Sequence, residues 1–264
     1  MQISTLPSSP VELRELIRRG ELIRPTGGLA PNHVQANLAI LPRDLAFDFM
    51  LFCQRNPTPC PLLEVVEAGS SEPKRMAPGA DLRTDLGKYR VYENGEVVAE
   101  VEDISDYWRD DLVSFLLGCS FSFESALIRA GISLPHIEQG TNVSMYITSV
   151  QTEPAGVFSG PMVVSMRSVP REKVVRAVQV TSRFPAVHGA PVHVGDPSAI
   201  GIKDVSIPDL GDPTEIKEGD VPVFWGCGVT PQAVAMNSKP PLMITHSPGY
   251  MFITDWLDED LAVI

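Results

Sequence analysis

Apolar residues at helical spacing predict two helices near the start of the chain. Residues 10–19 place their apolar side chains on one face; a capping box, Ser9-Pro10-Val11-Glu12, begins this helix and Gly20 ends it. The same spacing recurs over residues 43–56, where the three prolines of NPTPCP stop the second helix because proline cannot continue one. Residues 36–41, between the two helices, predict a short strand.

The middle and end of the chain combine apolar runs with alternating patterns. Residues 103–131 predict two helices, separated by Gly118-Cys119-Ser120 and ending at Gly131. A hairpin is predicted over residues 88–101, where two alternating runs flank Asn94-Gly95, a pair typical of a type I′ turn. A further amphipathic helix is predicted over 170–184, beginning at Pro170. Other strands are predicted over 62–69, 142–150, 160–169, 220–229, 241–247 and 249–256.

These elements do not alternate between strand and helix, as they would in a parallel α/β sheet. Helices gather mainly in the N-terminal half, and strands in the second half. We therefore predict an α+β fold with a mixed or antiparallel, curled sheet. Residues 1–264 form one compact domain in this interpretation, and a division into two closely packed subdomains near residue 135 stays open.

Composition and charge restrict the partners. The 264 residues are 44% hydrophobic and 20% charged, which is typical of a globular protein. The net charge of −12 repels phosphate backbones, so we expect no nucleic-acid partner. The same charge repels an anionic substrate at long range. Any anion site must therefore be local, made from a helix N-terminus or a placed arginine.

The amino terminus, MQISTLPSSP, has no basic segment and no apolar core, and no window reaches the roughly 18 apolar residues that span a bilayer. We therefore expect no membrane association and a cytoplasmic location. The four cysteines form no C-x-x-C pair and no zinc spacing, so free thiols in a reducing compartment are expected. A homo-oligomer is expected only because cytoplasmic proteins commonly form symmetric assemblies.

The segment DVPVFWGCGVTPQAV places Cys227 between Gly226 and Gly228, after a predicted strand. Thr230 and Pro231 are a good N-cap and first residue for a following helix. A glycine turn at a helix N-terminus can bring backbone N–H groups close to an anion. The interpretations are an oxyanion or carboxylate cradle beside Cys227, or a tight turn that buries a thiol.

A second Gly-Cys element stands at Gly118-Cys119-Ser120, just before a predicted helix with Glu124 in its first turn. A cysteine at a helix N-terminus can have a lowered pKa, so Cys119 and Ser120 are candidates for ligand contact. The alternative is a helix break with a serine cap. Two such elements in one chain favour a shared pocket.

The segment RFPAVHGAPVHVGDPSAIG contains His188, His193 and Asp196 between glycine- and proline-rich turns. One histidine and Asp196 could act as an acid–base pair. The three residues could also bind a metal ion, although their spacing is not a known ligand motif, or they could be histidines of surface turns. We assign them to the candidate catalytic residues with no metal.

Other polar residues are candidates for the walls of a pocket. Thr26-Gly27-Gly28 with Gln35 and Asn37 predicts a polar lining, and Asn142 opens a predicted strand. Arg167 lies within an apolar strand and Arg183 precedes an aromatic residue, so either could clamp a carboxylate. The chain has no G-x-S-x-G, Walker or G-x-G-x-x-G motif, which argues against nucleotide-dependent and esterase chemistry.

Eight segments together resemble the bacterial hydro-lyase family, also called the D-glutamate cyclase family. The resemblance runs from about Leu13 to the end of the chain, and its departure at Gly87, where the family tends to have proline, lies in a loop. The segments are QANLAILPRDLAFDFMLFCQRNPTPCPLLEV, DLRTDLGKYRVYENG, SFLLGCSFSFESAL, NVSMYITSV, GPMVVSMRSVP, RFPAVHGAPVHVGDPSAIGI, DVPVFWGCGVTPQAV and HSPGYMFITD.

The resemblance implies a lyase that removes water from D-glutamate to give 5-oxo-D-proline. Such a reaction needs a base, an acid, oxyanion donors and a carboxylate clamp, but no cofactor. The site residues are then our own assignment. Catalysis is assigned to Cys227, His188, His193, Asp196 and Cys119, and substrate binding to Gly226, Gly228, Thr230, Ser120, Asn142, Arg167 and Arg183. The alternatives are a metal-dependent hydratase and a non-enzymatic protein that binds small acids.

Overall fold

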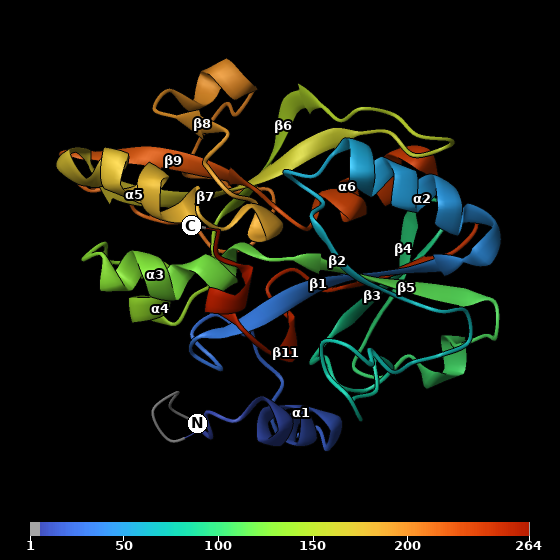
Figure 1. The fold of residues 1–264 in the computed structure, drawn as a ribbon. Helices are drawn as coiled ribbons and strands as arrows, with labels where there is room; N and C mark the ends of the chain where they lie inside the picture. Colours follow the sequence, from blue (N-terminus) through green and yellow to red (C-terminus); the bar gives the residue numbers. More distant parts are fainter. Residues whose placement is uncertain (1–5, 264) are drawn as a thin grey trace.

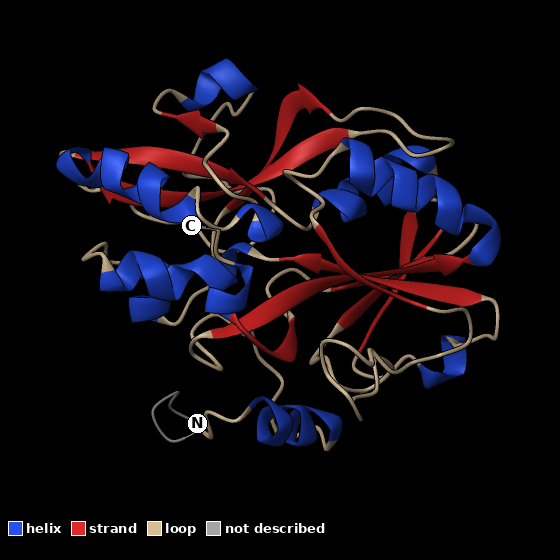
Figure 2. Ribbon diagram, in the orientation of Figure 1, coloured by secondary structure: helices blue, strands red, loops and turns tan. Residues whose placement is uncertain are grey.

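Two antiparallel sheets form the framework of the protein, and helices lie between and around them (Figures 1 and 2). The structure, a computed structural model, describes residues 6–263. The strands are β1 His33–Pro42, β2 Leu62–Val66, β3 Tyr89–Glu93, β4 Glu96–Val101, β5 Leu112–Gly118, β6 Met145–Gln151, β7 Pro161–Pro170, β8 His193–Val194, β9 Asp220–Gly226, β10 Met243–His246 and β11 Phe252–Leu257.

The helices are mostly short. The α-helices are α1 Pro10–Arg18, α2 Arg43–Arg55, α3 Glu124–Arg129, α4 Pro135–Gln139, α5 Val174–Thr181 and α6 Thr230–Ser238. Short 3₁₀ helices are η2 Ser105–Tyr107, η3 Ser120–Phe123, η4 Arg171–Lys173, η5 Pro185–Val187, η6 Pro197–Ile200 and η7 Asp258–Leu261. Among the residues that the structure describes, no helix is long and apolar enough to cross a membrane.

The larger sheet has the order β2-β5-β1-β10-β3-β4, with β11 also paired to β1. Its central strand β1 lies between β5 on one edge and β10 and β11 on the other. The smaller sheet has the order β6-β7-β9-β8. The larger sheet therefore combines strands from both ends of the chain, whereas the smaller sheet comes from one continuous stretch between them.

Buried clusters lie on both faces of each sheet, although the edge strand β4 is mostly exposed. On one face of the larger sheet, Phe49 and Phe52 of α2 pack with Phe115 of β5 and Val234 of α6. The helices α2 and α6 thus fill the space between the two sheets (Figure 1). On the smaller sheet, side chains of α3 and α5 pack against the face of β9 that carries Trp225, and this cluster also belongs to the interior.

The segment 112–118 corrects the prediction of two helices over residues 103–131. It is the strand β5, buried at every position and paired with both β1 and β2. A run such as Leu112-Val113-Ser114-Phe115-Leu116 is apolar without a clear period, because both faces of the strand are covered, and such a run does not distinguish a buried strand from a buried helix. The hydrogen-bonded pairing of residues 112–118 with two neighbouring strands identifies this segment as a strand.

Most other elements agree with their predictions, and three features differ. The α+β class is confirmed, all strand pairings in the two sheets are antiparallel, and the hairpin turns at Asn94-Gly95. The helix at Pro10 begins as predicted, but the side chain of Ser9 makes no capping hydrogen bond. Pro170 ends β7 instead of opening α5, which begins after the 3₁₀ turn at Val174. Strands are also common in the first half of the chain, contrary to the prediction.

Candidate active site

The ends of β5 and β9 meet where the two sheets approach each other. Cys119 follows β5 and Cys227 follows β9, and both thiols belong to one buried cluster. Glycine is required at these strand ends by close backbone contacts. A Cβ on Gly226 would lie 2.9 Å from the Thr58 carbonyl oxygen. The structure therefore brings the two Gly-Cys elements together.

The glycine at the end of β5 gives a direct test of this contact. A Cβ on Gly118 would lie 2.1 Å from the backbone oxygen of Ala186, so Gly118→Ala should lower the free energy of unfolding by about 1–3 kcal/mol through overpacking. Gly27→Ala is the matched control, because its Cβ would meet the Phe121 ring at an ordinary 3.7 Å. Chemical denaturation measures both. Equal stabilities would contradict the tight approach.

The two thiols are neutral at physiological pH. Burial raises the pKa of Cys227 to about 11, against the smaller opposing effects of the Val229 backbone N–H and of Arg167. Burial also raises the pKa of Cys119. A helix N-terminus therefore does not activate either thiol as a nucleophile, because the loss of water outweighs it.

An ion-paired carboxylate lies at the centre of the site. Glu124 Oε1 accepts hydrogen bonds from Arg167 Nη2 at 2.5 Å and lies 2.9 Å from His136 Nε2. Arg167 also donates to Ser165 Oγ at 2.6 Å and to Ser120 Oγ at 2.9 Å. The Arg167 side chain is fully buried and Glu124 is 3% exposed. Three elements, β7, α3 and α4, thus converge on one carboxylate.

Strand periodicity places Arg167 there. Alternate residues of β7 point to opposite faces, so Ser165 and Arg167 share the face that looks toward α3. The guanidinium carbon lies 5.6 Å from the centre of the Trp225 ring and 5.5 Å from that of Phe123, and both rings favour a cation. The buried guanidinium of Arg167 is therefore stabilised both by two aromatic rings and by its ion pair with Glu124.

The electrostatic balance at Glu124 favours the ionised form. Burial alone would raise the pKa of this carboxyl, but the charges of His136 and Arg167 and their hydrogen bonds outweigh burial and lower it. A buried carboxylate that stays ionised can accept a proton from a bound ligand.

Glu124 also lines a cavity of about 150 Å³. The cavity lies between the 28–35 segment, α3 and the start of η7, where Asp258 contributes a second carboxyl group. Burial raises the pKa of Asp258 to about 7; Glu259 and Glu124 add to this effect and Arg129 opposes it. One cavity therefore joins an ionised carboxylate to a carboxyl group that holds its proton near neutral pH.

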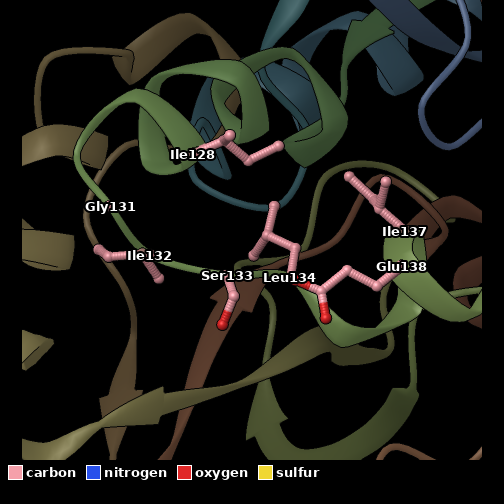
Figure 3. Close-up of a pocket in the computed structure, with 7 residues that line it drawn as sticks. All are labelled: Ile128, Gly131, Ile132, Ser133, Leu134, Ile137 and Glu138. Carbon is pink, nitrogen blue, oxygen red and sulfur yellow. The ribbon is translucent and has the colours of Figure 1, made fainter.

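A larger apolar hollow adjoins this cavity (Figure 3). Ile128 and Ile137 line both, and the hollow has a volume of about 370 Å³. Figure 3 shows Ile128 reaching from α3 toward Leu134 and Ile137. The hollow contains few polar groups, so the chemistry of the region belongs to the smaller cavity.

His188 lies near the thiols, beside the end of β5. It is buried, has a left-handed φ of 86°, and its Nδ1 donates to the Thr58 carbonyl at 2.7 Å. Nε2 has no hydrogen-bond partner. Burial lowers the pKa of His188 to about 4, so the imidazole is neutral. It could accept a proton only through Nε2.

His193 and Asp196 lie elsewhere. His193 stands on β8 with its ring 5.8 Å from that of Phe224, and Phe224 packs on the face of β9 opposite to Trp225. Its Nε2 contacts the backbone oxygen of Asp196, whose exposed carboxylate caps η6 instead. The structure does not bring this pair to His188. Within residues 6–263, no three His, Cys, Asp or Glu side chains are arranged to hold a metal ion.

The predicted binding residues are divided between site and scaffold. Ser120 contacts Arg167 directly. Thr230 is the first helical residue and not the N-cap; its hydroxyl donates to the Cys227 carbonyl at 2.7 Å, which shapes the turn. Arg183 is exposed and donates to a backbone oxygen near the C-terminus, so it does not reach the carboxylate centre.

Two residues close to the thiols anchor loops. Asn142 donates to the Pro248 carbonyl at 3.1 Å. A Cβ on Gly228 would lie 1.9 Å from the Asn37 amide nitrogen, which itself donates to Gly118 at 2.6 Å. The Gly228 turn is therefore closed by a side chain from β1, and it lines no part of the cavity beside Glu124.

Three residues of the centre were absent from the predicted site. The sequence places Glu124 only in the first turn of a predicted helix, although a carboxylate four residues after Ser120 of the Gly-Cys-Ser turn is a usable signal. His136 and Asp258 carried no signal in the sequence, because their roles depend on contacts between distant segments. Gly28 and Gln35, expected to line a polar pocket, do line the cavity.

The fold and the site define a class: an α+β protein that holds a small cavity, lined by both apolar and polar residues, beside a buried, ion-paired carboxylate. The D-glutamate cyclase family profile matches residues 113–255, and the chain belongs to this family. A Psychrobacter arcticus protein named "Putative hydro-lyase" is 64% identical over 256 residues, 97% of each chain. The family places the chain among enzymes of the hydro-lyase class.

Other relatives agree. A Thermoanaerobacter sp. protein, also named "Putative hydro-lyase", is 66% identical over 253 residues, 96% of each chain. The Bacillus subtilis protein named "Putative hydro-lyase YcsI" is 60% identical over 256 residues, which cover 97% of this chain and all of that protein. Among solved structures, the match to a nitrogen repressor-like protein from Methanococcus jannaschii covers 83% of this chain and 86% of that chain, with a TM-score of 0.38 and 9% identity.

Proposed function

We propose that this chain is a cofactor-free lyase that cyclises D-glutamate to 5-oxo-D-proline and water in the cavity between Glu124 and Asp258. The observation that carries the proposal is the presence of both carboxyl groups in one small, largely buried cavity. A volume of about 150 Å³ suits a small amino acid and not a nucleotide. Membership of the D-glutamate cyclase family supports the choice of substrate.

The proposed mechanism uses the two groups in opposite senses. Glu124, ionised, takes a proton from the substrate ammonium, and the amine attacks the γ-carboxyl carbon while Asp258 donates a proton to a γ-oxygen. A C–N bond forms and a C–O bond breaks. Two protons leave the nitrogen and both end on the departing oxygen as water, so the reaction has no net uptake of protons. Split acidities of this kind suit acid and base roles.

Arg167 acts here as a positioning residue. Its guanidinium is occupied by Glu124, Ser120 and Ser165, so it orients the base and keeps it ionised instead of binding the substrate carboxylate. Folding the substrate into a ring-closing geometry supplies a further part of the rate. Cys119, Cys227 and His188 do not line the cavity, and they stay candidates for groups that act through Arg167. Burial raises the pKa of Cys227 and lowers that of His188, and the charge of Arg167 lowers both pKa values.

A time course by NMR tests the proposal. Purified protein is incubated with D-glutamate, with L-glutamate and with 5-oxo-D-proline, each with and without EDTA. We expect interconversion of D-glutamate and 5-oxo-D-proline that survives EDTA, and at least a hundred-fold loss of rate, roughly, in Glu124→Gln. Activity lost with EDTA would indicate the metal-dependent alternative. No interconversion in either direction would refute the cyclase and favour a binding role.

A further inference from the structure

Two buried oxygen atoms in the cavity have no hydrogen-bond partner. They are Gln35 Oε1 and Asp258 Oδ1, on residues that are 3% and 2% exposed. Both residues line the cavity beside Glu124. A buried polar atom without a partner costs about 1–3 kcal/mol, so its presence in a cavity points to a ligand that supplies the missing donor.

The orientation of the Gln35 amide is fixed by its other end. Nε2 donates to the Thr26 carbonyl at 3.1 Å and to the Leu29 carbonyl at 3.0 Å. Both bonds require the NH₂ group on that side, so the oxygen is held on the other. Gln35 lies on β1 and does not titrate, so its oxygen is an acceptor whatever the protonation states of Glu124 and Asp258.

Gln35 Oε1 and Glu124 Oε2 can only accept hydrogen bonds, and Asp258 accepts through the oxygen that does not carry its proton. His136 and Arg167 both bond to Oε1 of Glu124, which leaves Oε2 for a ligand. A ligand carboxylate could accept a hydrogen bond only from Asp258, and the Glu124 carboxylate would repel it. An ammonium group brings three donors and a positive charge, which suit three acceptor oxygens on residues that line one cavity, one of them on an ionised carboxylate.

We infer that Gln35, Asp258 and Glu124 form a recognition site for a primary ammonium group, which selects amino acids over the corresponding acids without an amine. This inference deepens the proposed function, because it assigns the end of the substrate that enters first. The α-carboxylate of the substrate then faces outward, toward the rim where Arg129 donates to Asn32 Oδ1 and pairs with Glu259, and the γ-carboxyl group stays beside Asp258.

Binding of simple probes tests the site without any turnover. Isoleucine methyl groups are labelled with ¹³C, because Ile128 and Ile137 line the cavity, and methylammonium or acetate is titrated into the native protein. We expect saturable shifts of these two methyl signals with methylammonium and none with acetate. Gln35→Met should weaken methylammonium at least ten-fold, and Gln151→Met, the same change at an exposed position, should not.

Each outcome has one meaning. Saturation by methylammonium that depends on Gln35 supports the ammonium site, whether or not D-glutamate is cyclised. Acetate binding, equal affinity in Gln35→Met, or no saturation at all overturns it and leaves a hydrated structural cavity only. Cyclisation together with any of these results would keep the proposed function and reject this recognition. A cooperative unfolding curve for Gln35→Met, measured at the pH of the titrations, shows that the variant is folded.

Discussion

Replacing Arg167 by methionine is expected to lower the free energy of unfolding by about 3–5 kcal/mol. The change leaves Glu124 as a buried carboxylate with His136 as its remaining partner, and it removes the donors to Ser120 and Ser165. Breaking one side of a buried pair is costly because the other charge keeps its desolvation penalty. Urea denaturation at pH 7 measures the loss.

The double variant Arg167→Met/Glu124→Gln separates charge from packing. It should recover part of the stability, because no unpaired charge is left inside. Arg109→Met is the matched control: Arg109 pairs with Asp111 at the surface, half exposed, and its loss should cost about 1 kcal/mol or less. If Arg167→Met and Arg109→Met cost the same, the buried ion pair contributes no more than a surface pair.

Asp258→Asn is expected to stabilise the protein at pH 8 and to reduce activity. In the folded chain the pKa of Asp258 is about 7, against an ordinary value of 3.8. Between these values the folded chain keeps a proton that the unfolded chain has lost, so stability falls as pH rises through this window. The full cost above pH 7 is about 4 kcal/mol at most, and asparagine removes it.

Unfolding at two pH values isolates this effect. The gain in stability of Asp258→Asn should be larger at pH 8 than at pH 5 by about 2–3 kcal/mol. His188 and His246, whose pKa values burial lowers to about 4, act in the opposite sense, but equally in both proteins, so they cancel. A gain that is the same at both pH values would contradict the raised pKa.

The same variant should lose roughly 10²–10⁴-fold in kcat if Asp258 is the general acid. A gain in stability with a loss of activity distinguishes a functional carboxyl group from a structural one. Asp204→Asn is the control, because Asp204 is exposed and hydrogen bonds with Ser206 hold its pKa below the ordinary value. It should give no gain at pH 8 and leave turnover intact.

Local pattern predicted most elements of the fold, and the exception is informative. Amphipathic helices and the Asn94-Gly95 hairpin carry their signal within a few residues, so α2 and the β3–β4 pair agree with the sequence. The strand β5 has no such signal, because pairing with β1 and β2 covers both its faces. Each paired residue of β5 has a partner more than 40 residues away in the sequence, as Leu117 has in Leu62.

The site was predictable to the same extent. The two Gly-Cys turns were expected to share a pocket. The structure brings Cys119 and Cys227 into one buried hydrophobic cluster, and neither lines the cavity beside Glu124. The centre itself joins Glu124 to Arg167 and the cavity joins it to Asp258, contacts that span large distances along the chain. No local pattern marks such a pair, so the roles of these residues required the three-dimensional arrangement.

The position of β1 also governs how the molecule is made. One edge of β1 pairs with β5, which follows it within the first half of the chain. The other edge pairs with β10 and β11, residues 243–257. A ribosome must therefore release nearly the whole polypeptide before the larger sheet is complete. During synthesis, a long strand that is apolar from Leu38 to Pro42 presents an unpaired edge, the kind of surface that nascent-chain chaperones cover. A chain that ends prematurely, even by its last two strands, would remain in that unfinished state.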